Sequence, residues 1–128
     1  MVDRHVAARG VKDPRVLDAM REVPRHLFVP SVIAAKAYGP GALPIGSKQT
    51  ISQPYIVAVM VEAAAVGRND RVLEVGTGSG YAAAVLGELA DHVYTLARGQ
   101  IGFAGEPAEL AGADVFASYL GAELGAGP

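Results

Sequence analysis

The segment from Arg71 to Tyr81, R-V-L-E-V-G-T-G-S-G-Y, constrains the fold of this chain most strongly. Its first five residues are mostly apolar and β-forming, and they lead directly into glycines spaced as G-x-G-x-G. A helix-forming run follows, from Tyr81 to Leu89. This order predicts a buried strand, a tight turn and a helix, which together form the first unit of an α/β fold.

The glycines also indicate a ligand. Glycine lets the backbone approach a bound molecule closely, and the amide groups at the start of the next helix face that molecule. Glu74 points the same way, because a carboxylate inside an apolar strand is costly to bury without a partner. We therefore expect a site for an adenosine-bearing cofactor at this turn. The alternative is a turn that needs its glycines only for tight packing.

Length and composition bound the rest of the fold. The chain has 128 residues, 51% of them hydrophobic, which suffices for one core but is short for a complete doubly wound nucleotide-binding domain. A net charge of −2 without charge runs indicates neither a nucleic-acid face nor a polybasic membrane anchor. The absence of cysteine excludes disulfides, thiolate metal ligands and a cysteine nucleophile. Without a signal peptide or an apolar span, we expect a soluble, cytoplasmic protein.

Two helices are expected at the N-terminus. The first runs from Val2 to Arg9 and ends at Gly10, a glycine stop. The second runs from Pro14 to Val23, and Asp13 is well placed to cap it.

The segment R-H-L-F-V-P, from Arg25 to Pro30, lies between prolines and is expected to be extended or turned. We expect its apolar residues to pack inward; these are Leu27, Phe28 and Val29. His26 is interpreted as a capping or surface histidine, with a catalytic base or a ligand as the alternative.

A long loop is expected from Tyr38 to Gln53, because glycine, proline and small polar residues dominate it. Gly41 to Lys48 has the glycine spacing of a phosphate-binding loop, but Ser47 and Lys48 stand in reversed order and no strand precedes them. That interpretation is therefore rejected.

Ser52 is placed to cap a helix that runs from Gln53 to Val66, and a functional role for Ser52 is compatible with this. The helix is expected to pack through an apolar stripe made of Ile56, Val59, Met60 and Ala63.

Five blocks in this order resemble the N-terminal part of protein-L-isoaspartate O-methyltransferases: D-P-R-V-L-D-A-M, V-P-R-H-L-F-V-P, A-L-P-I-G, Q-T-I-S-Q-P-Y-I-V-A and V-L-E-V-G-T-G-S-G-Y. The resemblance covers about residues 1–94 and only about half of the usual enzyme. It implies transfer of a methyl group from S-adenosylmethionine to the carboxylate of isoaspartyl residues in damaged proteins or peptides, a repair reaction.

The resemblance also implies which residues form the site. It places Ser52 beside the reacting groups, with Thr50 in the same segment, and it implies no metal. The residues expected to line the cofactor are Glu74, Gly76, Thr77, Gly78, Ser79 and Gly80.

The sequence of this chain differs from the family pattern at the end of the next predicted strand. A carboxylate about 20 residues beyond the glycine turn grips the ribose hydroxyls in nucleotide-binding units. The methyltransferases have Glu there, whereas this chain has Ala97. Asp91 precedes the strand and is expected at the opposite end of the sheet. Losing two charge-assisted hydrogen bonds predicts a cofactor affinity weaker by about two or more powers of ten.

The tail follows a different pattern. His92 to Ala104 is expected to form a β-hairpin around a glycine turn, followed by short helices over 107–110 and 114–120. Residues 88–121 resemble the C-terminal end of ATPase subunits of branched-chain amino-acid ABC transporters, without any ATP-hydrolysing motif. We therefore expect a junction near 88–94, as in a fused or frameshifted gene product.

The predicted fold is α/β: N-terminal helices, an incomplete Rossmann-like methyltransferase domain, then the hairpin and helices of the tail. We divide the chain into residues 1–94 (1–66 helical and loop region, 67–94 first βα unit) and 95–128 (tail). Unpaired strands predict oligomerisation as one outcome. The alternatives to an active methyltransferase are an inactive cofactor-binding or interaction fragment and a broken fusion product.

Overall fold

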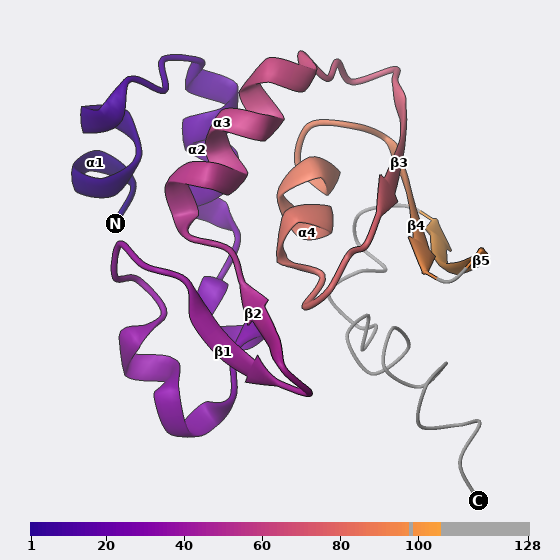
Figure 1. Cartoon of the computed structure of the whole chain (residues 1–128). Coiled ribbons are helices and arrows are strands. Elements are labelled where there is room, and N and C mark those ends of the chain that lie inside the picture. The colour runs from indigo at the N-terminus through magenta and orange to yellow at the C-terminus, as the bar shows by residue number, and fades with distance from the viewer. Residues whose placement is uncertain (98, 106–128) are drawn as a thin grey trace, which may run out of the picture. The chain divides into compact units, whose positions relative to one another are not determined.

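The computed structural model describes residues 1–97 and 99–105 of the chain (Figure 1). It divides the chain between Val66 and Gly67 into two units. The first unit holds helices and a two-stranded hairpin, and the described part of the second holds a three-stranded sheet and one helix. The expected α/β class is confirmed, and the helices expected over 107–110 and 114–120 lie outside the described residues.

The first expected helix is interrupted. Helix α1 spans Val2–His5, and a separate 3₁₀ turn spans Ala7–Arg9, because Val6 between them has non-helical backbone angles. Gly10 ends this segment as expected, with a φ of 112° that favours glycine.

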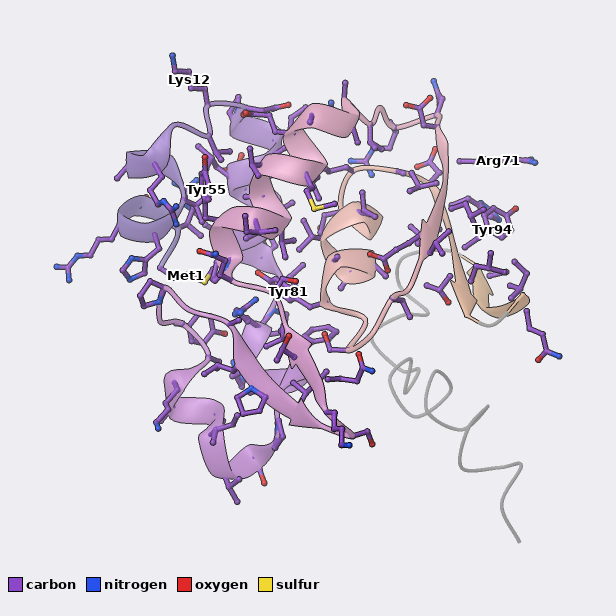
Figure 2. The ribbon with its side chains drawn as sticks, in the orientation of Figure 1. Met1, Lys12, Tyr55, Arg71, Tyr81 and Tyr94 are labelled. Carbon is purple, nitrogen blue, oxygen red and sulfur yellow. The ribbon has the colours of Figure 1, made fainter. Side chains whose placement is uncertain are left out.

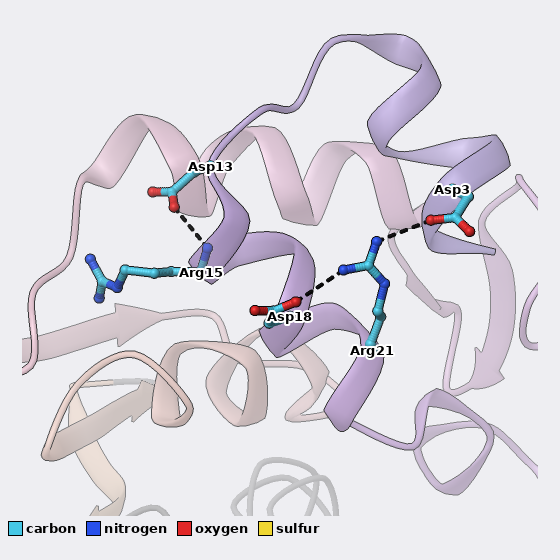
Figure 3. Close-up of polar contacts among 5 residues, drawn as sticks. All are labelled: Asp3, Asp13, Arg15, Asp18 and Arg21. Carbon is cyan, nitrogen blue, oxygen red and sulfur yellow. Dashed lines mark hydrogen bonds and ion pairs between the residues drawn. The ribbon is translucent and has the colours of Figure 1, made fainter.

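Helix α2 spans Pro14–Glu22 and confirms its predicted cap. The Arg15 amide donates to Asp13 Oδ1 at 2.9 Å (Figure 3). Pro14 occupies the first turn of the helix. On the exposed side of the helix, Arg21 forms ion pairs of 3.0 Å with Asp3 and with Asp18 (Figure 3). Solvent screens such surface pairs, so the helix depends mainly on its buried face, which includes Val16, Ala19 and Met20.

The segment after α2 agrees with the sequence prediction in part. Residues Arg25–Phe28 form a 3₁₀ helix, the turned alternative, and a second 3₁₀ helix follows at Ser31–Lys36. Leu27 is 70% exposed and so does not pack inward, while the guanidinium-bearing Arg25 is fully buried. The 3₁₀ turn directs Arg25 inward, where backbone carbonyl groups compensate for the lost solvation of its charge.

The expected long loop contains a β-hairpin. Strand β1, Leu43–Gly46, pairs antiparallel with β2, Gln49–Ile51. Ser47 and Lys48 form its two-residue turn at φ values of 52° and 59°, the positive values that such hairpin turns require. Burial of Ile45 and Ile51 explains why a glycine- and proline-rich segment still forms strands.

Helix α3 spans Pro54–Ala64, and its cap position is Gln53 rather than the expected Ser52. The predicted apolar stripe was wrong, because Ile56 and Met60 are exposed. The buried stripe consists of Pro54, Val57, Ala58 and Val61. The helix is apolar on nearly all sides, so its sequence could not show which side packs against α1 and α2 (Figure 1).

The second unit contains β3 (Arg71–Val75), α4 (Tyr81–Gly87), β4 (His92–Ala97) and β5 (Gln100–Gly105). The sheet order is β3-β4-β5; β4 runs parallel to β3 and antiparallel to β5, which confirms the expected hairpin. Helix α4 packs against β4, on the face where Val93 and Thr95 are buried. The opposite face of β3 is open, since Leu73 is 55% and Val75 72% exposed. The prediction of a buried strand was therefore wrong for β3, because Val72 and Glu74 are only partly buried and its other residues are exposed.

Candidate functional site

The glycine turn joins β3 to α4 at the carboxyl end of the strand. Gly76, Gly78 and Gly80 have φ values of 73°, 56° and 86°, in the left-handed region that side chains rarely adopt. The Gly76 amide donates to the Leu96 carbonyl at 3.0 Å, which continues the parallel ladder into the turn. The Gly80 amide donates to the Thr77 carbonyl at 3.0 Å, so the turn closes on itself. The alternating glycines are therefore required by the backbone path.

The same glycines leave room beside the backbone. A Cβ atom added at Gly76 or at Gly78 would meet no heavy atom within 4 Å. Tight packing therefore does not explain the glycines at these two positions, whereas their positive φ values do, and the ligand site stays a prediction. Open space above a turn of this kind suits a molecule that lies close to the backbone.

Glu74 is the candidate carboxylate at this turn. Its Oε1 is buried and accepts no hydrogen bond within the described part of the chain. Burial raises the pKa of its carboxyl above the ordinary 4.5, and the Thr77 side chain partly opposes this shift. The opposing effect of Thr77 is small, because its Oγ1 forms no hydrogen bond of ordinary geometry among the described residues. Burial is therefore the main cause of the raised pKa.

Thr95 was not among the residues predicted from the sequence. It lies directly opposite Glu74 in the parallel register, its side chain is 1% exposed, and its Oγ1 has no hydrogen-bond partner among the described residues. Opposed residues of neighbouring strands project from the same face, so Glu74 and Thr95 lie on one face of the sheet. Each has a buried side-chain oxygen, as does Thr77 in the turn after β3. The sequence did contain a pattern that could have revealed this pair, because Glu74 and Thr95 are each the fourth residue of their strand.

Ser79 has a local structural role. Its Oγ accepts a hydrogen bond from the Tyr81 amide at 3.2 Å, at the start of α4. One of the amides expected to face a ligand is therefore already bonded. The Ser79 hydroxyl proton can still be donated outward.

The two ends of β4 carry the expected residues. Asp91 precedes the strand, and its amide donates to the Arg68 carbonyl at 3.0 Å. Ala97 is the last residue of β4 and pairs with Gln100. The position where the sequence predicts a ribose-binding carboxylate is thus Ala97, at the end of the strand beside the glycine turn.

Thr50 and Ser52 belong to the first unit. Both are exposed, while Ile51 between them is buried, so the two hydroxyl groups lie on the side away from the core. Ser52 does not cap α3, and no hydrogen bond of its Oγ occurs within residues 1–97 and 99–105. Its carbonyl oxygen instead accepts a hydrogen bond from Arg25 Nη2 at 2.8 Å.

Other candidate groups offer less. His26 is exposed, and its Nδ1 lies 2.7 Å from Tyr38 Oη, as befits a surface histidine. The described residues contain no group of three or more His, Cys, Asp or Glu side chains able to hold a metal ion. In the described part of the chain, no helix has both the length and the apolar character needed to cross a membrane.

A parallel β3–α4–β4 unit with a glycine turn at the carboxyl end of its first strand defines a Rossmann-like class of protein. Comparison with known families is more specific. The model of the Protein-L-isoaspartate(D-aspartate) O-methyltransferase (PCMT) family matches residues 1–98. The chain therefore belongs to this family, and the match extends slightly beyond the resemblance seen over about 1–94.

Relatives bear this name too. Protein-L-isoaspartate O-methyltransferase 2 of Geotalea uraniireducens is 57% identical over 98 residues, which cover 77% of this chain and 45% of the relative. The enzymes of Rhodopseudomonas palustris and a Synechococcus species are 60% and 61% identical over 98 residues, with 45% and 40% of their lengths covered. The chain thus spans less than half the length of these relatives.

A solved structure of a protein-L-isoaspartate O-methyltransferase is also similar. It has a TM-score of 0.59 and 27% sequence identity, and the match covers 74% of this chain and 33% of that one. The likeness agrees with the α/β fold described above.

Proposed function

We propose that this chain takes part in S-adenosylmethionine-dependent methyl transfer to the carboxylate of isoaspartyl residues in damaged proteins or peptides. One observation carries the proposal: the family match over residues 1–98 includes every expected site residue. The geometry of the glycine turn supports it, because the turn leaves open space beside a carboxylate without a hydrogen-bond partner among the described residues.

The chemistry makes modest demands on the protein. S-Adenosylmethionine supplies a sulfonium methyl group, which is already an activated electrophile. An ordinary carboxylate with a pKa near 4 is ionised at neutral pH, so this reaction needs no general base. The acceptor oxygen bonds to the methyl carbon as the carbon–sulfur bond breaks, and no proton is transferred. The protein has to align the groups and exclude water.

The candidate site residues would divide between binding the cofactor and orienting the acceptor. The carboxylate of Glu74 would accept hydrogen bonds from the amino-acid end of the cofactor, beside the buried hydroxyls of Thr77 and Thr95. The backbone of Gly76, Gly78 and Gly80 would approach it closely, and Ser79 would donate its hydroxyl proton. The exposed hydroxyls of Thr50 and Ser52 would orient the acceptor carboxylate.

A second candidate is a module that binds the cofactor or a protein partner without catalysis. Ala97 favours it, because the last residue of β4 cannot hold the ribose hydroxyls. The short coverage of the relatives favours it as well. This candidate predicts binding of S-adenosylhomocysteine without turnover.

We further propose the division into residues 1–94 and 95–128, a cytoplasmic location and a junction near 88–94. The family match ends at residue 98, just beyond that junction. The resemblance of residues 88–121 to an ABC transporter ATPase subunit remains part of this proposal. Genomic sequence across codons 85 to 100 would decide it, since an intact reading frame continuing the methyltransferase would rule out a fusion.

Methyl transfer from labelled S-adenosylmethionine to an isoaspartyl peptide tests the main proposal. We expect transfer by the unaltered chain and a loss of about tenfold or more in a Ser52→Ala, Gly78→Ala double variant. The matched control is Ser31→Ala with Gly10→Ala, which also changes an exposed serine and an unhindered glycine of positive φ. Transfer equal in both double variants would contradict the proposal. Calorimetric binding of S-adenosylhomocysteine without transfer would favour the second candidate.

A further inference from the structure

Arg25 is the most deeply buried charged side chain among the described residues, with an exposed fraction of 0%. Its Nε donates to the Ala37 carbonyl at 2.6 Å, and its Nη2 donates to the Ser52 carbonyl at 2.8 Å. A guanidinium loses much solvation when it is buried, and charge-assisted hydrogen bonds compensate for that loss. The two carbonyl groups therefore hold this charge in one orientation.

The two carbonyl groups flank a functional segment. Ala37 follows the 3₁₀ helix Ser31–Lys36, and Ser52 follows strand β2. Between them runs the hairpin β1–β2, which includes Thr50. One guanidinium thus joins both ends of the segment that bears the two exposed hydroxyls.

A second arginine holds the residues that follow. Arg9 Nη1 donates to Gln53 Oε1 at 3.2 Å, and the Arg9 guanidinium lies 3.8 Å from the centre of the Tyr55 ring. Figure 2 shows Tyr55 at the start of α3, on the side of the N-terminal residues. Ser52 is therefore fixed between a hairpin tied by Arg25 and a helix start tied by Arg9.

We propose that Arg25 is a positioning residue for the acceptor site: its guanidinium fixes the backbone at Ser52 and so directs the hydroxyls of Thr50 and Ser52. This inference rests on the proposed function. Lysine cannot replace Arg25, because an ammonium group lacks the planar fork that reaches two carbonyl groups in fixed directions.

Spin labelling tests the inference without relying on activity. The chain has no cysteine, so Ser52→Cys gives a unique attachment point for a nitroxide, and Met60→Cys gives a reference on the exposed side of α3. We expect Arg25→Lys to increase the mobility of the label at position 52 and to leave the label at position 60 unchanged. Arg21→Lys, an exposed arginine of the preceding helix, is the matched control and should change neither label.

Arg25→Gln is the second variant, for the case that Arg25→Lys does not fold. It removes the buried charge and keeps one donor group. Unchanged mobility at position 52 in both Arg25 variants would overturn the inference. Increased mobility at both labelled positions would overturn it too, since Arg25 would then serve overall stability rather than the position of Ser52.

Kinetics supply the second readout. We expect Arg25→Lys, with Ser52 intact, to lower kcat/KM for an isoaspartyl peptide about tenfold, while the Kd for S-adenosylhomocysteine stays within about twofold. Loss of both in parallel would contradict a positioning role. If the unaltered chain transfers no methyl group, the proposed function fails, and the spin labels still decide whether Arg25 fixes Ser52.

Discussion

At the scale of single residues, Glu74 combines a structural cost with a proposed binding role. Burial raises the pKa of its carboxyl, so the folded chain holds a proton more tightly than the unfolded chain does. The free energy of unfolding therefore falls as the pH rises from the unfolded pKa through the folded one. The Oε1 atom of Glu74 is buried and has no hydrogen-bond partner among the described residues, which agrees with this cost.

We predict that Glu74→Gln raises the thermal midpoint at pH 7 and that this gain shrinks as the pH falls toward 4.5. The same substitution should weaken S-adenosylhomocysteine binding about tenfold, because a charged acceptor is lost. Thermal unfolding from pH 4 to pH 8 and calorimetry measure the two effects. Glu22→Gln, an exposed glutamate at the end of α2, is the control for the binding measurement. A gain in thermal midpoint that is smaller at pH 7 than at pH 5 would contradict the raised pKa of Glu74.

At the scale of elements, the start of α2 depends on a distant side chain. Glu62 Oε2, from α3, accepts hydrogen bonds of 2.8 Å from the amides of Lys12 and Asp13. Negative charge at a helix start is favourable, since the amide groups there lack partners within the helix. Asp13 then caps the Arg15 amide, so the two carboxylates act in sequence along the backbone.

We predict that Glu62→Ala lowers the free energy of unfolding of the first unit by about 2 kcal/mol, because it leaves two amides without an acceptor. Chemical denaturation followed by circular dichroism would measure this change. Glu22→Ala, an exposed glutamate at the end of α2, is the control and should change stability by less than about 0.5 kcal/mol. Equal losses in the two variants would show that the contact is not stabilising.

At the scale of the whole molecule, the described sheet leaves apolar surface uncovered. Strand β3 lies at its edge, with Leu73 and Val75 exposed on the face opposite α4. Figure 2 places Tyr94 on the neighbouring strand β4, where it is half-buried. Sheets with parallel strands are usually covered on both faces, and free edges pair with other chains.

We predict that the chain associates with itself as its concentration rises, and that Leu73→Thr with Val75→Thr weakens this association about tenfold or more. Sedimentation velocity over a concentration series would measure it. Val32→Thr is the control, because this valine of the first unit is 90% exposed and should not affect association. A monomer at every concentration would exclude oligomerisation through β3.

Much of the fold follows from local sequence. The Asp13 cap, the Gly10 stop, the strand at Arg71–Val75 and the glycine turn were all predicted, because each depends on residues a few positions apart. The candidate cofactor residues around the turn follow for the same reason, since they occupy one short segment. The position of Glu74 within that segment was also clear from the sequence. Its Oε1 is buried without a hydrogen bond among the described residues, which agrees with the expected cost of burying a carboxylate.

Tertiary structure decided the rest. It chose the buried side of α3, which an evenly apolar helix cannot specify, and it turned an expected loop into a hairpin around Ile45 and Ile51. Arg25 reaches the Ser52 carbonyl across 27 positions, and Glu62 reaches the Lys12 amide across 50. Contacts at such separations exist only once the chain has packed, so local patterns cannot reveal them. The glycine turn was therefore set by sequence, whereas the support of Ser52 was set by packing.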